Sequence, residues 1–174
     1  GDTPGEINEK FTAITGRAPM LPEWAAGFWQ CKLRYETQEE LLQVAREYKR
    51  RGLPISVIVI DYFHWTMQGE WKFDPEKWPD PKAMVSELAS MGIKLMVSIW
   101  PTIDPRSENY AYMREHNYIL RGERGVDVVF MFFGPQTYVD TTHPGAREFF
   151  WSRAKENYYD YGIRTFWLDE AEPE

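Results

Sequence analysis

The chain has 174 residues, of which 43% are hydrophobic and 16% aromatic, so it can bury a core and is not intrinsically disordered. Its 27 acidic and 20 basic residues give a net charge of -7, and its basic residues form no block beyond residues 49–51. A polyanion would find no basic surface here, so we expect neither nucleic acid nor a membrane surface as a partner.

The sequence shows no membrane span, no signal peptide and no disulfide. Its longest strongly apolar run, residues 57–60, is far shorter than the roughly 20 residues that cross a bilayer. Nothing at the N-terminus resembles a charged-then-apolar leader. We therefore expect a soluble chain, and its compartment stays undetermined. The single cysteine, Cys31, cannot close an intrachain disulfide and has no second thiol nearby for a metal.

The N-terminal part reads as a helix followed by a connector. Thr3 is a candidate N-cap, Pro4 suits the first helical position, and Glu6 completes a capping box, so a helix should run to about residue 16. A proline-rich stretch follows. We expect residues 1–22 to lead into a domain that occupies residues 23–174.

Strand and helix patterns alternate through that domain. The predicted strands are residues 25–29, 55–60, 93–100 and 163–168. The helices between them should begin after Thr37, after Asp80 and at Pro144, where capping residues or proline precede an apolar periodicity. A weaker helical pattern covers residues 107–118, and a hairpin is expected as an insertion near residues 119–140.

This alternation predicts an α/β fold with a parallel sheet, either doubly wound or closed into a barrel. No glycine-rich phosphate loop follows any of the strands, which counts against the nucleotide-binding doubly wound form. Polar residues at the carboxyl ends of strands fit a (β/α)8 TIM barrel. Four units are half of eight, so we expect the first half of a barrel that belongs to a longer polypeptide.

Carboxylates follow two of the predicted strands. Asp169 comes directly after the fourth strand, with Glu170 and Glu172 close behind. It can be a catalytic carboxylate at the barrel's functional end, or the N-cap of a next helix with Glu172 closing the capping box. Because crowded like charges raise a carboxyl pKa and a nucleophile must stay ionised, the two glutamates should point away or be paired.

Asp61 follows the second strand in the segment IVIDYFHW. Because a carboxylate among aromatic side chains can accept hydrogen bonds from sugar hydroxyls, Asp61 is a candidate sugar-binding residue. The alternative is that Asp61 is an ordinary carboxylate of a turn. Tryptophans near strand ends, such as Trp65 and Trp100, can stack on the C–H faces of sugars or simply fill a core. His64 has no second histidine near it in sequence, which favours a structural role over a metal site.

These segments resemble glycoside hydrolase family 31, which comprises retaining α-glucosidases and α-xylosidases with a (β/α)8 barrel. The segment FWLDEAEPE is similar to the family's nucleophile motif, and IVIDYFHW resembles the strand whose aspartate binds the sugar beside the cleaved bond. WKFDPEKWPDP and LMVSIWPTIDP resemble the next loop and the third strand. The resemblance runs from about Pro19 to the end of the chain.

The resemblance implies that Asp169 is the nucleophile. The implied substrate-binding residues are Asp61, Tyr62, Phe63, Trp65, Trp100, Trp167 and Glu172. Some members of the family have lysine at the position of Trp167, and some xylosidases have an aromatic residue at that of Ser98. The acid/base aspartate is implied to lie beyond Glu174, on the rest of the same polypeptide. No cofactor and no metal are required.

The predicted function is a retaining α-glycosidase that hydrolyses terminal α-linked sugars, most of all α-xylosides of xyloglucan-type oligosaccharides. An α-glucosidase of the same family is the alternative within the class. A metal-dependent barrel hydrolase would have to use Asp61, His64, Asp169 and Glu172 without the usual paired histidines. A carbohydrate-binding module without catalysis is the third possibility. We expect the 174-residue chain alone to be inactive, because half of the barrel and the acid/base residue are missing.

Overall fold

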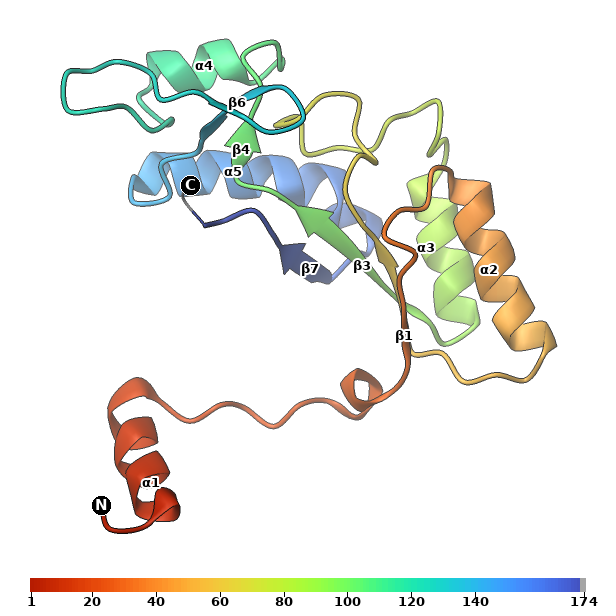
Figure 1. Cartoon of the computed structure of the whole chain (residues 1–174). Helices are drawn as coiled ribbons and strands as arrows, with labels where there is room; N and C mark the ends of the chain where they lie inside the picture. Colours follow the sequence, from red (N-terminus) through yellow and green to blue (C-terminus); the bar gives the residue numbers. More distant parts are fainter. Residues whose placement is uncertain (173–174) are drawn as a thin grey trace.

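Four parallel strands form the main sheet of the computed structural model, which describes residues 1–172. The strands are β1 (Trp29–Gln30), β2 (Val57–Ile60), β3 (Lys94–Ile99) and β7 (Thr165–Leu168). They are neighbours in this order, and each is parallel to the next (Figure 1). Sequential parallel strands joined by helical crossovers are the arrangement of a (β/α)8 barrel wall.

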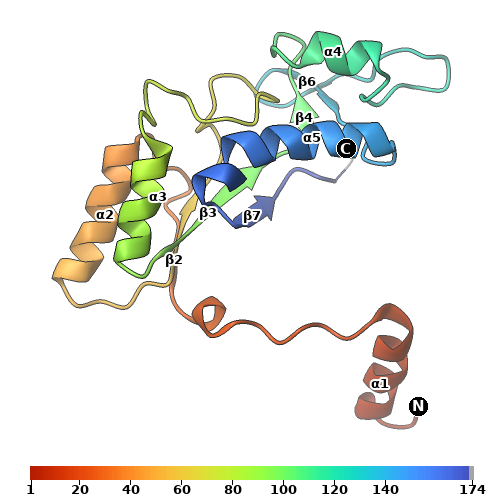
Figure 2. The same ribbon diagram turned by 180° about the vertical axis from the view of Figure 1, so that it is seen from behind.

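The helices that connect these strands cover one face of the sheet. They are α2 (Gln38–Arg50), α3 (Pro81–Ser90) and α5 (Pro144–Asn157). In Figure 1, α5 passes behind β3, and α2 and α3 lie side by side next to the strands; Figure 2 shows the same layer from behind. Leu41 and Met84 on the helices are fully buried in one apolar cluster with Ile58 and Val97 of the strands. Since a doubly wound sheet carries helices on both faces, this one-sided layer fits a barrel.

The other face of the sheet is the inner side of the barrel wall. Val57, Val59 and Met96 form a small separate cluster there, against which Trp24 and Trp29 pack. Alternate residues of a strand point to opposite faces, so the strands contribute to both clusters in turn. This explains why the predicted strand at residues 55–60 is apolar without alternation.

Three helices begin where the sequence predicts. In α1 (Pro4–Thr15) the backbone N–H of Glu6 donates to Thr3 Oγ1 at 3.2 Å. Thr37 caps α2 through a hydrogen bond of the same length, and Asp80 Oδ1 accepts from the third residue of α3 at 2.9 Å. Each cap satisfies a backbone donor that the first turn leaves free, so these predictions are confirmed.

The first predicted strand, residues 25–29, is wrong in its bounds. Residues Glu23–Ala26 form a short 3-10 helix, and β1 comprises only Trp29–Gln30. The reason is the packing of Trp24, whose ring stacks on Trp29 at 6.1 Å beneath the inner face of the sheet. The turn that carries Trp24 there cannot at the same time be an extended strand.

A second, smaller sheet lies over the carboxyl ends of β2 and β3 (Figure 1). It consists of β4 (Thr102–Ile103), β5 (Phe130–Met131) and β6 (Pro135–Tyr138), in the antiparallel order β4-β6-β5. The helix expected at residues 107–118 is shorter, α4 (Tyr110–Glu115), because Asn117 adopts a left-handed conformation with φ of 58° and ends it.

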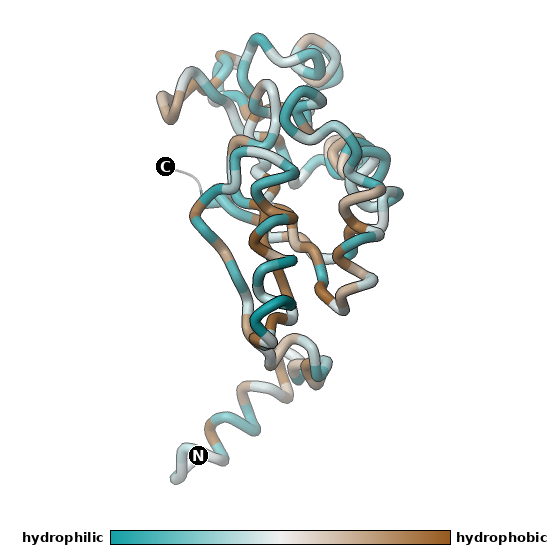
Figure 3. The backbone as a smooth tube through the Cα atoms, turned by 90° about the vertical axis from the view of Figure 1, so that its right-hand side faces the viewer, coloured by the Kyte–Doolittle hydropathy of each residue, from teal (hydrophilic) through white to brown (hydrophobic). Residues whose placement is uncertain are grey.

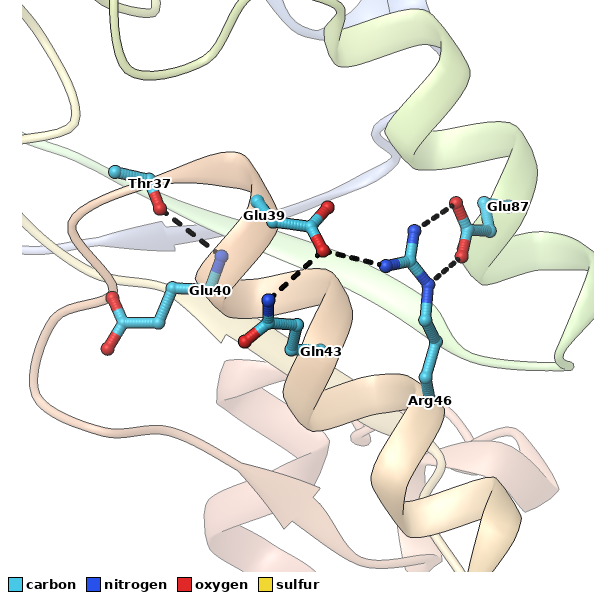
Figure 4. A network of polar contacts seen from close by, with 6 residues as sticks. All are labelled: Thr37, Glu39, Glu40, Gln43, Arg46 and Glu87. Carbon is cyan, nitrogen blue, oxygen red and sulfur yellow. Dashed lines mark hydrogen bonds and ion pairs between the residues drawn. The ribbon is translucent and has the colours of Figure 1, made fainter.

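Two peripheral features complete the fold. α1 stands apart from the barrel wall at the end of an extended connector, while the most apolar stretches of the backbone lie in the central strands (Figures 1 and 3). On the outer surface, Arg46 of α2 forms two hydrogen bonds to Glu87 of α3 and one to Glu39 (Figure 4). Among residues 1–172 no helix is long and apolar enough to cross a membrane.

Candidate active site

The strand registers bring the predicted site residues together at the carboxyl end of the sheet. β3 pairs with β7 at Ser98 and Trp167, and the same register continued by two residues places Trp100 beside Asp169. On its other side β3 pairs with β2, and this register continued by one residue places Asp61 beside Ser98. Alternation along the strands sets all five residues on the inner face.

Asp61 is held by two hydrogen bonds. Its Oδ1 accepts from the backbone N–H of Tyr62 at 2.8 Å, and the Cys31 thiol donates to Oδ2 at 3.7 Å. Burial raises the pKa of the Asp61 carboxyl, the Tyr62 N–H opposes that rise, and the negative charge of Asp169 adds to it. The two carboxylates lie on the same inner face of the sheet, and the charge of Asp169 acts on Asp61.

Asp169 lies at the end of β7 and is half-buried. Its backbone N–H donates to the carbonyl oxygen of Ile99 at 3.2 Å, which extends the β3–β7 ladder up to the carboxylate. Glu172 is exposed, and its backbone carbonyl accepts a hydrogen bond from the Tyr138 hydroxyl at 2.7 Å.

Four predicted aromatic residues form a wall beside these carboxylates. Trp100 lies 5.7 Å from Tyr62, 6.1 Å from Phe63 and 5.4 Å from Trp65, measured between ring centroids. Trp65 and Trp100 are buried, whereas Tyr62 and Phe63 are half-buried. The two buried rings support the two that remain accessible, and accessible rings are the ones that can contact a sugar.

Sequence reasoning missed two further rings of this wall. Phe133, in the turn between β5 and β6, stacks on Tyr62 at 6.0 Å and meets Phe63 edge-on at 5.0 Å. Its neighbour Phe132 lies 5.8 Å from Trp100. The available signal was the run FMFFG at residues 130–134, since aromatic residues at an exposed turn need a partner; Phe133 is 65% exposed.

His64 is buried and takes part in the structure rather than in a ligand set. Its Nδ1 lies 2.8 Å from the carbonyl oxygen of Asp61, and its Nε2 lies 2.9 Å from the Tyr158 hydroxyl. Since a carbonyl only accepts, Nδ1 carries the proton and Nε2 accepts from Tyr158. Among residues 1–172 no group of three or more His, Cys, Asp or Glu residues could hold a metal ion.

We expect His64 to make the stability of the protein depend on pH. Burial lowers the pKa of its imidazole to about 4, whereas in the unfolded chain it is about 6.5. Between these values the unfolded state binds more protons, so the free energy of unfolding should fall as pH is lowered through this window. For this one group the slope is at most about 1.4 kcal/mol per pH unit.

Denaturant unfolding of the complete protein, followed by tryptophan fluorescence across this pH window, measures the effect. His64→Gln has no titrating group at the position and should show a shallower dependence on pH than the wild type. Equal slopes in the two proteins would contradict the assignment. The comparison cancels the carboxylates elsewhere in the chain, because they are identical in both.

The sequence of the domain matches a known family. The model of the glycosyl hydrolases family 31 TIM-barrel domain matches residues 18–174. The chain belongs to glycoside hydrolase family 31. The predicted family and the predicted (β/α)8 barrel class are thereby confirmed.

Three similar proteins illustrate the relationship. A crystal structure of a GH31 alpha-xylosidase from a soil metagenome, complexed with xylose, has a TM-score of 0.94 and 64% identity over 100% of this chain and 26% of that chain. The uncharacterized family 31 glucosidase ORF2 of Pseudescherichia vulneris is 56% identical over 100% of this chain and 33% of its own length. Alpha-xylosidase A of Aspergillus niger is 38% identical over 95% of this chain and 23% of its own length. The chain thus spans a third or less of these relatives.

Trp167 has a distinct position in this family 31 domain. It lies opposite Ser98 on the inner face, and 51% of its surface is exposed. Ser98 is buried, and its hydroxyl has no hydrogen-bond partner among residues 1–172. Trp167 does not belong to the aromatic wall. Its position near the carboxylates follows from the pairing of β7 with β3. Its role in substrate binding stays a prediction.

Proposed function

We propose that the complete protein is a retaining α-glycosidase that releases terminal α-linked xylose from xyloglucan-type oligosaccharides. The observation that carries this proposal is the position of Asp61 and Asp169 at the carboxyl ends of β2 and β7, which the strand registers set on the same inner face of the sheet. An aromatic wall stands beside them. Membership of family 31 supports the reaction class.

In this proposal Asp169 is the nucleophile. Its carboxylate attacks the anomeric carbon through an oxocarbenium-like transition state, while a second carboxyl group about 5 to 5.5 Å away protonates the departing oxygen. That second group belongs to the remainder of the polypeptide. A water molecule, deprotonated by the same group, then cleaves the glycosyl ester and frees Asp169. Two inversions at the anomeric carbon give net retention.

Asp61 would hold the sugar on which Asp169 acts. As an ionised acceptor it can take hydrogen bonds from two sugar hydroxyls, and the N–H of Tyr62 fixes its orientation before the sugar arrives. Tyr62 and Phe63 offer the accessible ring surface on which the sugar would lie. These roles require no metal and no organic cofactor.

Xylose and glucose differ only in the hydroxymethyl group on C5, so the choice between them depends on the space beside that carbon. Two of the three relatives described above are named alpha-xylosidases, one of them with xylose bound. This favours an α-xyloside. The 56% identical relative is named a glucosidase, which keeps an α-glucoside as the second candidate substrate.

Assays of the complete protein on aryl α-xyloside and aryl α-glucoside test the proposal. We expect a higher kcat/KM on the xyloside, and NMR of the first product should show the α-anomer. The β-anomer as first product would refute a retaining mechanism. A preference for the glucoside would leave the mechanism in place and change the substrate.

A metal-dependent hydrolase is separated from this proposal by elemental analysis of the complete protein. Stoichiometric, tightly bound zinc together with loss of activity on chelation would overturn the glycosidase mechanism described here. The described residues offer no cluster for such an ion. Activity that survives chelation supports the two-carboxylate mechanism.

A further inference from the structure

The insertion formed by residues 102–139 contacts the chain that follows the proposed nucleophile. The segment 169–172, which begins at that nucleophile, has no regular secondary structure. The hydroxyl of Tyr138, the last residue of β6, donates a hydrogen bond to the backbone carbonyl of Glu172 at 2.7 Å. In Figure 1 the chain after β7 turns toward β6, and this hydrogen bond joins two residues that are 34 positions apart in the sequence.

Tyr138 is itself held firmly by its backbone and by its ring. β6 pairs with β4 so that Tyr138 lies opposite Thr102, and the next backbone N–H, that of Val139, donates to the carbonyl oxygen of Pro101 at 2.8 Å. The ring stacks on Phe130 of β5, with centroids 4.7 Å apart, and is 7% exposed. A side chain fixed in this way by packing and by its strand can hold another segment in place.

The segment 169–172 is fixed at both of its ends. At its start the backbone N–H of Asp169 donates to the carbonyl oxygen of Ile99, and at its other end Tyr138 holds Glu172. Between these two points Glu170 has a φ of 51°, a left-handed conformation that costs free energy in a residue other than glycine. Such a conformation persists only where the surroundings impose it, so loss of the second hydrogen bond would let the backbone beside Asp169 relax.

The position of a nucleophile matters more than that of most side chains. The reacting atoms must lie about 3 to 3.5 Å apart with their orbitals aligned, and a displacement of about 1 Å can slow the reaction about 10²-fold. In the proposed function the sugar is held by Asp61 and by the aromatic wall, which lie outside the segment 169–172. A shift of Asp169 should therefore slow its attack and leave the binding of the sugar nearly unchanged.

We infer that Tyr138 is a positioning residue for Asp169 and that it acts through its hydrogen bond to the carbonyl of Glu172. The inference rests on the proposed function and deepens it, because it gives the insertion a part in placing the nucleophile. The same insertion also reaches the segment after the other carboxylate, where Phe133 stacks on Tyr62.

Tyr138→Phe in the complete enzyme tests the inference, because the variant loses only the hydroxyl and keeps the ring that stacks on Phe130. On an activated aryl α-xyloside we expect kcat/KM, which reports the attack by Asp169, to fall about tenfold. The inhibition constant of free xylose should change less than about twofold. Equal weakening of xylose binding would overturn the inference in favour of a general disturbance of the site, and an unchanged kcat/KM would show that the hydrogen bond does not place the nucleophile.

Tyr112→Phe is the matched control for the loss of a tyrosine hydroxyl. Tyr112 is 45% exposed on α4 of the same insertion, and its ring stacks on Phe149 at 4.9 Å, a contact that phenylalanine retains. This variant should keep the kcat/KM and the xylose inhibition constant of the wild type. A tenfold loss of kcat/KM here as well would overturn the inference, because the effect would then not depend on the bond to Glu172.

A second comparison replaces the nucleophile itself. In Asp169→Ala, azide can take the place of the carboxylate: its nitrogen forms the bond to the anomeric carbon while the aryl oxide departs. Because azide is not attached to the segment 169–172, the addition of Tyr138→Phe should change the azide-dependent rate less than about twofold. A tenfold loss in this background too would mean that Tyr138 supports the whole site, and would overturn the inference.

The wild-type enzyme decides separately on the proposed function. If it hydrolyses neither the aryl α-xyloside nor the aryl α-glucoside, the proposed function fails and the inference fails with it. If it hydrolyses either one, the glycosidase stands, and the Tyr138 variants decide on the inference with the preferred glycoside and its free sugar.

Discussion

Replacement of Asp169 by alanine in the complete enzyme should lower kcat by a factor on the order of 10⁴ or more. In the proposed mechanism the glycosyl-enzyme intermediate cannot form without this carboxylate. KM should change far less, because the sugar is held mainly by other groups. Steady-state kinetics on an activated aryl α-glycoside measures both quantities.

Azide provides the control for this variant. Alanine leaves space where the carboxylate stood, so a small external anion should attack the anomeric carbon and restore part of the rate. Since only one inversion then occurs, the glycosyl azide formed should have the β-configuration. Full activity of Asp169→Ala without azide would show that Asp169 is not the nucleophile.

The strands and helices of the barrel are predicted well from the sequence, because local rules determine them. The run at residues 55–60 is apolar on both faces because one face packs on helices and the other on the inner cluster. Thr37 and Asp80 each begin a helix because their side chains accept a hydrogen bond from a free backbone N–H of the first turn. Such a cap depends only on residues that are neighbours in the sequence. The order of such elements then limits the topology to parallel neighbours.

The rest of the site depends on contacts that have no local signature. Ala25 and Ala26 leave the predicted strand because the 3-10 helix Glu23–Ala26 packs the ring of Trp24 against Trp29 under the sheet, a contact that only the tertiary structure reveals. Phe133 reaches Tyr62 from about seventy residues further along the chain, so sequence spacing could not place them together.

Asp61→Asn should lower kcat/KM by about 10²- to 10³-fold, with most of the loss in kcat. The carboxylate is already oriented by the Tyr62 N–H and the Cys31 thiol, so it needs no rearrangement as the sugar distorts. An amide keeps the shape and one acceptor but loses the charge that strengthens hydrogen bonds to the transition state. Asp160→Asn, at an exposed site after α5 where the carboxylate pairs with Lys155, is the matched control and should leave the rate unchanged.

The same residue should shape the acid side of the pH profile. Because burial and the charge of Asp169 raise the pKa of Asp61, its carboxyl takes up a proton at a higher pH than an ordinary aspartate. Once protonated, the carboxyl group has no charge and one of its oxygens becomes a hydrogen-bond donor. We therefore expect kcat/KM to fall as the pH drops through that raised pKa. In Asp61→Asn this group cannot titrate, and the fall of kcat/KM should begin at lower pH. Identical acid limbs in the two enzymes would show that Asp61 does not hold the sugar in its ionised form.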